Sequence, residues 1–418
     1  MMLLKKLKIK RRMITWLSAM HFFGNPSAKM KIVGVTGTNG KTTTTTLLYD
    51  VAMALGHKSG LIGTVENRIG EERLPATHTT PDPLNLNKLL KKMAEAGCEY
   101  VFMEVSSHAL DQKRTAGVAF AGAVFTNLTH DHLDYHQNVE NYFNAKKKLF
   151  KYLPATSFAI SNVDDPYGEK ILEGISGRKF SYGFDKKADY YGKIDSLNFS
   201  GLQLEINSTP ITSKLIGKFN AYNILAVWSV CNLLGFDMKK VAEIFKGIKP
   251  PNGRFEHFVS PTGALVIIDY AHTPDALLKV LLTANEIKCK GSPCMLSTGA
   301  PRLISLAGCG GDRDPMKREK MGRIAAELSD ISIFTSDNPR NEDPSKIIEE
   351  MKTSLTPDLL EKVKTIPDRR EAIIKSVRIA KEGDIILCAG KGHEDYQEIE
   401  GVKHHFNDLE EYKKAYEK

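Results

Sequence analysis

The sequence predicts an α/β protein with two domains, each built on a mainly parallel sheet. Short apolar runs alternate with helical patterns along the chain, which is the rhythm of βαβ units covered on both faces. The chain has 418 residues, of which 42% are hydrophobic and 26% charged, an ordinary globular composition with room for two or three domains. The stretch at 246–256 contains Pro and Gly and is typical of a linker between domains.

Eight apolar runs are expected to form the strands of these sheets, and a polar loop follows each run. They lie at 32–35, 100–105, 123–126 and 158–161 in the first half, and at 264–269, 303–307, 331–334 and 384–389 in the second. A change to short alternating stretches at 194–212 predicts a small β excursion. Ligands of open α/β sheets bind beyond the carboxyl ends of the strands, so the polar loops outline two binding edges.

The net charge of +8 does not indicate a nucleic-acid-binding protein, because the basic residues are not spread over a domain face. Six of the positive charges lie in an acid-free start and leave only +2 for the rest of the chain; they are Lys5, Lys6, Lys8, Lys10, Arg11 and Arg12. The six cysteines form no CxxC pair, which fits a reducing compartment.

The first 25 residues have a basic start and an apolar part, as a signal peptide does, but polar residues interrupt that part and no cleavage site is clear. No apolar run is long enough to span a bilayer. We therefore expect a cytoplasmic protein that binds neither nucleic acid nor a membrane.

A phosphate-binding loop follows the first strand. Residues 36–43 read TGTNGKTT, a compact G-x-x-G-K-T that lacks the first glycine of the standard GxxxxGK[ST] loop. Backbone N–H groups at Gly37 and Gly40 can approach phosphate oxygens, and Lys41 can neutralise the β- and γ-phosphates. Thr42 can hold Mg²⁺ at the start of the helix that follows. A Gly-rich turn without a ligand is the alternative, but the strand before and the helix after favour nucleotide binding.

An acid and a histidine-rich loop follow the next two strands. Glu104 ends an apolar strand, where it is an odd core residue but suits a Mg²⁺ ligand beside a triphosphate. Residues 129–136 read THDHLDYH, which differs from the HxHxDH of dinuclear metallohydrolases by the extra Tyr135. A hydrolytic metal pair next to a phosphate loop would be unusual. We therefore favour a single ligand, His132, that serves the metals of the nucleotide.

Together these motifs resemble those of the Mur ligases, the ATP-dependent enzymes that add amino acids to peptidoglycan precursors. They run in order along most of the chain: TGTNGKTT, MEVSSHALDQKR, FTNLTHDHLDYH, NAKK, KFNAYN, GRFE, DYAHTPD, GGDRD, SDNPR and GKGHEDY. The resemblance implies a central P-loop ATPase domain with a mainly parallel sheet at 30–249 and a C-terminal Rossmann-like α/β domain that binds the amino acid at 250–418. Residues 1–29 would be a remnant of the family's N-terminal uridine-binding domain.

The resemblance also implies an ATP site with two Mg²⁺ ions. Thr42 and Glu104 would hold one ion, and His132 and Lys146 the second. The family carries a lysine carbamate at the position of Lys146, and the CO₂ adduct of a neutral amine is a hard oxygen ligand. Lys41, Glu104, His132 and Lys146 would be the catalytic residues. The residues implied to bind ATP are Gly37, Thr38, Asn39, Gly40, Lys41, Thr42, Thr43, Asn220, Asn223, Asp269 and His272.

Two further substrates are implied, UDP-N-acetylmuramoyl-L-Ala-D-Glu and meso-2,6-diaminopimelate. The DNPR form is associated with diaminopimelate rather than lysine, because Arg340 could grip its distal carboxylate and would repel the ammonium of lysine. The muramoyl-dipeptide would be held by His78, Thr79, Thr80, Ser106, Gln112 and Arg114. Diaminopimelate would be held by Arg313, Asp337, Asn338, Pro339, Arg340, Gly390 and Glu394.

The implied reaction transfers the γ-phosphate of ATP to the side-chain carboxylate of D-Glu, and the amine of diaminopimelate then attacks the acyl phosphate to form an amide. We expect a monomer. The alternatives are a truncated relic that binds ATP without catalysis, a Mur ligase that adds another amino acid, and a folylpolyglutamate synthetase. Two features depart from the family pattern: His130 stands where Arg is more frequent, and 289–302 looks like an enlarged surface loop.

Overall fold

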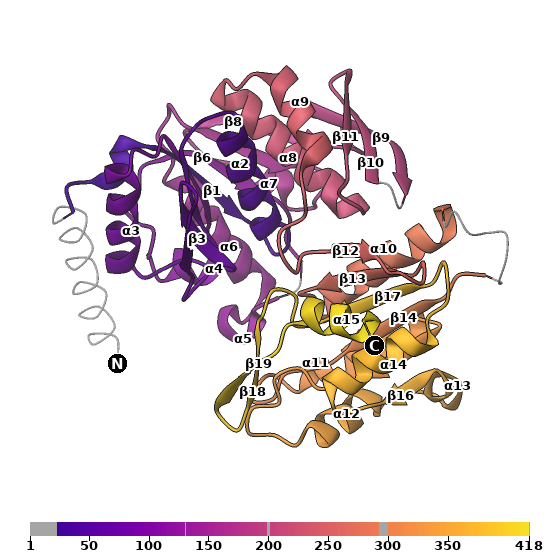
Figure 1. Ribbon diagram of the computed structural model, residues 1–418. Coiled ribbons are helices and arrows are strands. Elements are labelled where there is room, and N and C mark those ends of the chain that lie inside the picture. The colour runs from indigo at the N-terminus through magenta and orange to yellow at the C-terminus, as the bar shows by residue number, and fades with distance from the viewer. Residues whose placement is uncertain (1–22, 130, 199–200, 292–299, 418) are drawn as a thin grey trace. The chain divides into compact units, whose positions relative to one another are not determined.

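The computed structural model describes residues 23–129, 131–198, 201–291 and 300–417 of the chain. Contacts divide it into two compact units, one made mainly of the residues up to Lys249 and one made mainly of Pro250–Lys418. Each unit consists of a mainly parallel β-sheet with helices packed on it (Figure 1), so the predicted α/β class is confirmed.

The first unit carries an eleven-stranded sheet in its described residues, in the order β11-β10-β9-β8-β7-β6-β1-β5-β2-β3-β4. From β9 to β2 the neighbours run parallel, while β2–β3–β4 and β10–β11 pair antiparallel at the two edges. The β excursion is thus present. The strands are β1 (Lys31–Thr36), β2 (Ser59–Ile62), β3 (Glu66–Ile69), β4 (Glu72–Pro75), β5 (Tyr100–Glu104), β6 (Phe120–Phe125), β7 (Phe158–Asn162), β8 (Arg178–Gly183), β9 (Tyr190–Asn198), β10 (Gly201–Ile206) and β11 (Thr209–Ser213).

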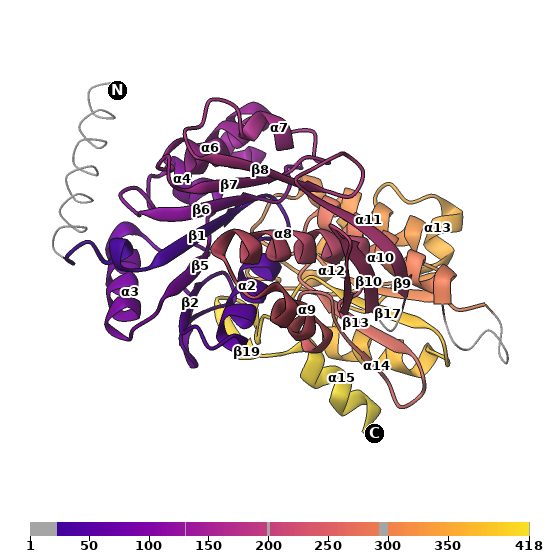
Figure 2. The ribbon, with the colours of Figure 1, turned by 90° about the horizontal axis from the view of Figure 1, so that it is seen from above.

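Helices cover both faces of this sheet. Figure 2 shows α4, α6 and α7 on one side of the strands and α2, α8 and α9 on the other. Side-chain caps begin several helices: the carboxylate of Asp82, for example, accepts from the N–H groups of Leu84 and Asn85. The bounds are η1 (Pro26–Lys29), α2 (Lys41–Ala54), α3 (Pro83–Glu95), α4 (Ser107–Asp111), α5 (Leu133–His136), α6 (Val139–Lys151), α7 (Gly168–Ile171), α8 (Lys218–Leu234) and α9 (Met238–Gly247).

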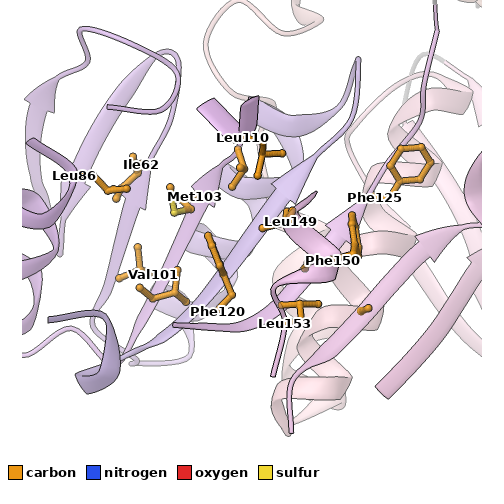
Figure 3. Close-up of a cluster of buried hydrophobic side chains, with 14 of the residues drawn as sticks. Ile62, Leu86, Val101, Met103, Leu110, Phe120, Phe125, Leu149, Phe150 and Leu153 are labelled. Atoms are coloured by element: carbon orange, nitrogen blue, oxygen red, sulfur yellow. The ribbon is translucent and has the colours of Figure 1, made fainter. Parts of the chain in front are cut away.

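A buried apolar cluster joins the sheet to the helices on one face (Figure 3). Val101 and Met103 point to the same face of β5 because side chains alternate along a strand. They belong to one cluster with Leu86 of α3 and with Leu149 and Phe150 of α6, all fully or almost fully buried. The cluster fixes β5 against its helices and therefore fixes the place where that strand ends.

The second unit carries a six-stranded sheet in its described residues, in the order β12-β13-β17-β14-β15-β16. Only β12 is antiparallel to its neighbour. Strands β18 and β19 form a separate hairpin. The strands are β12 (Glu256–Val259), β13 (Leu265–Asp269), β14 (Leu303–Ala307), β15 (Ile331–Phe334), β16 (Val363–Thr365), β17 (Ile385–Ala389), β18 (Tyr396–Ile399) and β19 (Val402–His405).

The helices of this unit pack on its sheet through apolar faces. Ala372 and Ile373 of α14 and Tyr412 of α15 share a core cluster with strand residues such as Ile304 and Ile386. The bounds are α10 (Pro274–Gly291), α11 (Met316–Leu328), α12 (Pro344–Lys352), α13 (Pro357–Glu361), α14 (Arg369–Ile379) and α15 (Asp408–Tyr416). The loops after β13, β14, β15 and β17 therefore leave the sheet at one edge, since these strands are parallel neighbours.

All eight predicted strands are present: β14 and β15 have the predicted bounds, and the other six differ from them by one to three residues at an end. The linker is shorter than expected, because α9 continues to Gly247. Of the enlarged loop, the first three residues belong to α10, while 292–299 lie outside the described residues, as do His130 and the basic start. Within the described part of the chain, no helix is both long and apolar enough to cross a membrane.

Candidate functional site

The phosphate loop joins the end of β1 to the start of α2, and two glycines make its path possible. A Cβ on Gly37 would lie 1.9 Å from Oγ1 of Thr126. Gly40 has a left-handed backbone with φ 85°, and a Cβ there would lie 2.7 Å from Oδ1 of Asn223. Side chains at these positions would clash, so the loop requires glycine at both places for steric reasons.

Residues at the end of β6 hold this loop in shape. The N–H of Thr38 donates to the carbonyl of Asn127 and the N–H of Asn39 donates to Oδ1 of Asn127, both at 2.9 Å. Oγ1 of Thr126 donates to the carbonyl of Asn39 at 2.6 Å. The ammonium of Lys41 donates to the carbonyls of Gly37 (2.9 Å) and Thr38 (2.7 Å). The lysine is thus folded over the loop whose phosphate it is predicted to bind.

Glu104 lies beside the loop because β5 pairs with β1 in a register that sets Glu104 opposite Val35. The residue is only 1% exposed. Its Oε2 accepts from Oγ1 of Thr42 at 3.0 Å. Thr64, just beyond β2, donates to the same carboxylate twice, from its N–H at 2.7 Å and from its Oγ1 at 3.0 Å. These three donors satisfy a buried carboxylate and fix its orientation.

Lys146 of α6 is buried against the same loop. Its Nζ donates to the carbonyl of Gly37 at 2.7 Å and lies 4.4 Å from the ring centre of Tyr142. Burial lowers the pKa of Lys146 well below its ordinary value, the charge of Lys41 lowers it further, and Asp131 opposes the shift. A neutral amine is the form of lysine that reacts with CO₂, so the environment of this side chain fits a carbamate.

His132 lies near this site but is less firmly held. Its backbone is left-handed, with φ 54°, and its side chain is 46% exposed. Nε2 lies 3.5 Å from Oδ2 of Asp131, and the ring lies 4.8 Å from the ring of His108. Partial desolvation of the ring, with the positive charges of Lys41 and Lys146 nearby, lowers the pKa of His132 and favours the neutral imidazole, the form that can act as a ligand. Among the side chains that the structure describes, no three His, Cys, Asp or Glu residues gather as a metal site.

The residues predicted to hold the muramoyl-dipeptide form a hydrogen-bonded group around Thr80. Its Oγ1 donates to the carbonyl of Glu104 at 2.9 Å and accepts from the N–H of Ser106 at 3.1 Å. Arg114 donates to the carbonyl of Thr80 at 2.8 Å and to Oε1 of Gln112. The structure therefore brings these four residues to the edge of the sheet where β5 ends at Glu104.

Two further members of that set are placed less tightly. Oγ1 of Thr79 lies 3.0 Å from Oγ1 of Thr64, which places it beside a hydrogen-bond partner of Glu104. His78 is exposed, and its Nδ1 lies 3.2 Å from Oγ1 of Thr77.

The four residues predicted near adenine and ribose lie in two pairs. In the first unit, Nδ2 of Asn223 donates to Oδ1 of Asn220 at 3.0 Å, beside the phosphate loop. In the second unit, Oδ2 of Asp269 accepts from the N–H of Phe255 at 2.8 Å, and burial raises the pKa of Asp269 to about 6. His272 donates through Nδ1 to a backbone carbonyl 2.7 Å away, and burial lowers its pKa.

In the second unit, the loops after β15 and β17 bring together most of the residues predicted for diaminopimelate. Nδ2 of Asn338 donates to Oε2 of Glu394 at 2.8 Å. Burial and the nearby charge of Asp337 raise the pKa of Glu394. A Cβ on Gly390, whose φ is 117°, would lie 3.3 Å from Oδ2 of Asp337. Lys391, which was not predicted as a site residue, lies among them with no exposed side-chain surface.

Arg340 is fixed at the edge of this group by the hairpin of β18 and β19. Its Nη1 donates to the carbonyl of Gly311 at 2.7 Å and its Nε donates to Oε2 of Glu398 at 3.2 Å. The isolated bridge to Ile399 holds its backbone, which has a φ of 53°. Arg313, by contrast, is exposed.

Two family models match the chain. The model of the Mur ligase middle domain matches residues 35–231, and the model of the Mur ligase glutamate ligase domain matches residues 253–392. The chain belongs to the Mur ligase family. The first match contains the phosphate loop, Glu104 and Lys146, and the second contains Asn338 and Lys391.

Relatives within the Mur ligase family are similar over most of this chain. A UDP-N-acetylmuramoyl-L-alanyl-D-glutamate–2,6-diaminopimelate ligase of Parabacteroides distasonis is 49% identical over 395 residues, which are 94% of this chain and 79% of that protein. The ligase of the same name from Aquifex aeolicus is 43% identical over 94% of this chain and 79% of its own length. A solved structure of a ligase with this name has a TM-score of 0.66 and 34% identity, and covers 93% of this chain and 78% of that one.

Sequence reasoning missed four residues that this Mur ligase places at its candidate site. Thr126 and Asn127 support the phosphate loop, Thr64 orients Glu104, and Lys391 contacts Asn338 and Glu394. Position at the end of a strand was a usable signal for Thr126 and Asn127. Thr64 carried no such signal, since it stands in no motif. Its contact with Glu104 arises only because β2 pairs with β5.

Proposed function

We propose that this Mur ligase is an ATP-dependent ligase that adds meso-2,6-diaminopimelate to the D-Glu of UDP-N-acetylmuramoyl-L-Ala-D-Glu, in the cytoplasm, for peptidoglycan precursor synthesis. The unit up to Lys249 is the ATP-binding domain and Pro250–Lys418 the amino-acid-binding domain in this proposal. The names of the relatives at 49% and 43% identity support it. The observation that carries it is the hydrogen bond from Thr42 of the phosphate loop to the buried carboxylate of Glu104.

The phosphate-loop geometry supports transfer to a carboxylate on the neighbouring surface. Loop amides and Lys41 would bind the phosphates of ATP, and the start of α2 faces them with the positive end of its dipole. The group around Thr80 lies directly beyond Glu104, on the same edge of the sheet. A substrate carboxylate held there would be close to the γ-phosphate, and positioning of this kind supplies much of the catalysis of phosphoryl transfer.

The chemistry of the side chains fits two Mg²⁺ ions. Thr42 and Glu104 would hold one, while neutral His132 and Lys146 as its carbamate would hold the second. When bound, the ions neutralise charge on the transferring phosphoryl group. Burial lowers the pKa of Lys146 and so favours the neutral amine, whereas a protonated amine can neither add CO₂ nor coordinate a cation.

The pocket of the second unit supports an amino acid with charged groups at both ends. Arg340 would bind the distal carboxylate of diaminopimelate, while Glu394 and Asp337 would face its ammonium. The first step forms a bond between an oxygen of the D-Glu carboxylate and the γ-phosphorus and releases ADP. The free amine then attacks the acyl carbon, phosphate leaves, and an amide remains.

The test is ADP release by the purified full chain with ATP and Mg²⁺. We expect release only when both the UDP-linked dipeptide and diaminopimelate are present, and little release when lysine replaces diaminopimelate. Folded protein that binds ATP but stays inactive with all substrates would contradict the proposal and favour the non-catalytic relic. Equal activity with lysine would favour a ligase for another amino acid.

A further inference from the structure

Lys391 is a buried lysine in the loop that follows β17, and its exposed side-chain fraction is 0%. A buried ammonium is costly unless it is paired and hydrogen-bonded, so its partners indicate why it is there. Nζ donates to Oδ1 of Asn338 at 3.2 Å and to Oε2 of Glu394 at 3.1 Å, and lies 4.0 Å from Oδ1 of Asp337. A single ammonium thus contacts the loops after β15 and β17.

The first consequence concerns the amide of Asn338. Its Oδ1 accepts from Lys391 and also from the N–H of Glu398 at 2.9 Å. Both partners are donors, so the oxygen of the amide must face them and the NH₂ group must face Glu394. Lys391 therefore helps to fix which end of this amide is presented to Glu394.

The second consequence concerns charge. Asp337 and Glu394 are two buried or largely buried carboxylates, and Lys391 compensates one of them. Among the described residues, none donates a hydrogen bond to Oδ1 of Asp337. The cluster keeps one negative charge and one vacant acceptor, which an incoming ammonium group can satisfy. Without Lys391 the negative charges of Asp337 and Glu394 would repel each other with no cation between them.

We infer that Lys391 is a positioning residue of the amino-acid pocket: it orients the amide of Asn338 and the carboxylate of Glu394 so that they can receive the ammonium group of the added amino acid. The inference rests on the proposed function. Lys391 acts through its two partners and not by contact with the reacting atoms.

The variant K391M tests this in the full chain, by ADP release at varied concentrations of each substrate. We expect the KM for diaminopimelate to rise tenfold or more, while the KM values for ATP and for the UDP-linked dipeptide change less than twofold. The matched control is K403M, because Lys403 is an exposed lysine of the β18–β19 hairpin whose Nζ lies 3.9 Å from the ring centre of Tyr396. The control should keep the wild-type KM values.

A double-variant cycle separates positioning from a merely structural role. If Lys391 acts through Glu394 and Asn338, K391M should raise the KM for diaminopimelate less in the E394Q background than in the wild type, because one of its two partners is already altered there. The double variant leaves no unpaired charge between the two residues, so it remains informative even if K391M alone folds poorly. The inference would be overturned if the effects of K391M and E394Q on the KM for diaminopimelate multiplied independently. It would also be overturned if K391M kept the wild-type KM for diaminopimelate. A wild-type chain without diaminopimelate-dependent ADP release would overturn the proposed function itself, and the inference with it.

Discussion

Thr42 and Glu104 stand 62 residues apart in the sequence, yet the hydroxyl of Thr42 donates to Oε2 of Glu104 across 3.0 Å. The parallel pairing of β1 and β5 creates this contact, since it sets the last residue of β5 beside the start of the phosphate loop. A buried carboxylate next to the predicted phosphate loop is the feature from which the proposed phosphoryl chemistry follows.

Replacement of Glu104 by Gln should lower kcat by about 10²–10³, the size of effect seen when one preorganised electrostatic contact is removed from an active site. The variant keeps the shape of the side chain but loses its charge. Steady-state ADP release is the measurement. The matched control is E99Q, which removes an exposed acid at the opposite end of β5, where its partner is His57. A kcat for E104Q within threefold of the control would show that the carboxylate is not needed.

Thr64 should affect catalysis mainly through Glu104, to which its N–H and its hydroxyl both donate. The variant T64V keeps the N–H bond to Oε1 but removes the hydroxyl bond to Oε2, so we expect a kcat about tenfold lower, consistent with the loss of one charge-assisted hydrogen bond. The variant T64S should restore most of the rate because it returns the hydroxyl. Equal rates for T64V and T64S would refute this role.

A methyl group at Gly37 should disrupt ATP binding. The Cβ of G37A would lie 1.9 Å from Oγ1 of Thr126, so the loop must shift away from its supporting residues. We expect the Kd for ATP, measured by calorimetry, to rise more than tenfold. The control G247A adds a methyl group at the end of α9 with nothing within 4 Å and should leave the Kd unchanged. Tight ATP binding by G37A would contradict the assigned role of the loop.

The variant R340K tests the amino-acid end of the proposal. Lysine keeps the charge but cannot donate at once to Gly311, to Glu398 and to a substrate carboxylate in the fixed geometry of a guanidinium. The KM for diaminopimelate should rise by about tenfold to a hundredfold, while the KM for ATP stays constant. R323K, on the exposed side of α11, is the control. An unchanged KM in R340K would place the distal carboxylate elsewhere.

The buried carboxyl of Asp269 predicts a pH dependence of stability. Its pKa is raised from 3.8 to about 6 by burial, so between these values the folded state binds more protons than the unfolded state. Stability from this group therefore falls as the pH rises from about 4 to 6, by a total of about 3 kcal/mol. In D269N this contribution is absent, so its melting temperature relative to the wild type should be higher at pH 7 than at pH 4.5. The opposite trend would show that the carboxylate is better stabilised folded than unfolded.

The sequence was sufficient for the fold because its strands are short apolar runs with a polar loop after each, and because the βαβ rhythm leaves few arrangements for them. The phosphate loop, Glu104 and the DNPR segment were predicted as site residues from short motifs. Motifs do not show which side chains are buried. The sequence shows three adjacent lysines at 146–148, but only the packing of α6 on the loop shows that Lys146 is enclosed.

Contacts between residues that follow different strands could not be predicted from the sequence either. Thr64 contacts Glu104 because β2 pairs with β5, and Lys391 contacts Asn338 because β17 and β15 both lie beside β14. The order of the strands in each sheet determines these contacts, and no local sequence pattern predicts that order.

The most direct test of the central claim follows an oxygen atom. The UDP-linked dipeptide is prepared with ¹⁸O in the side-chain carboxylate of its D-Glu and is incubated with the full chain, ATP, Mg²⁺ and diaminopimelate. If that carboxylate accepts the γ-phosphate, one ¹⁸O atom leaves with each inorganic phosphate, and mass spectrometry detects it there. Amide formation with unlabelled phosphate would contradict the account.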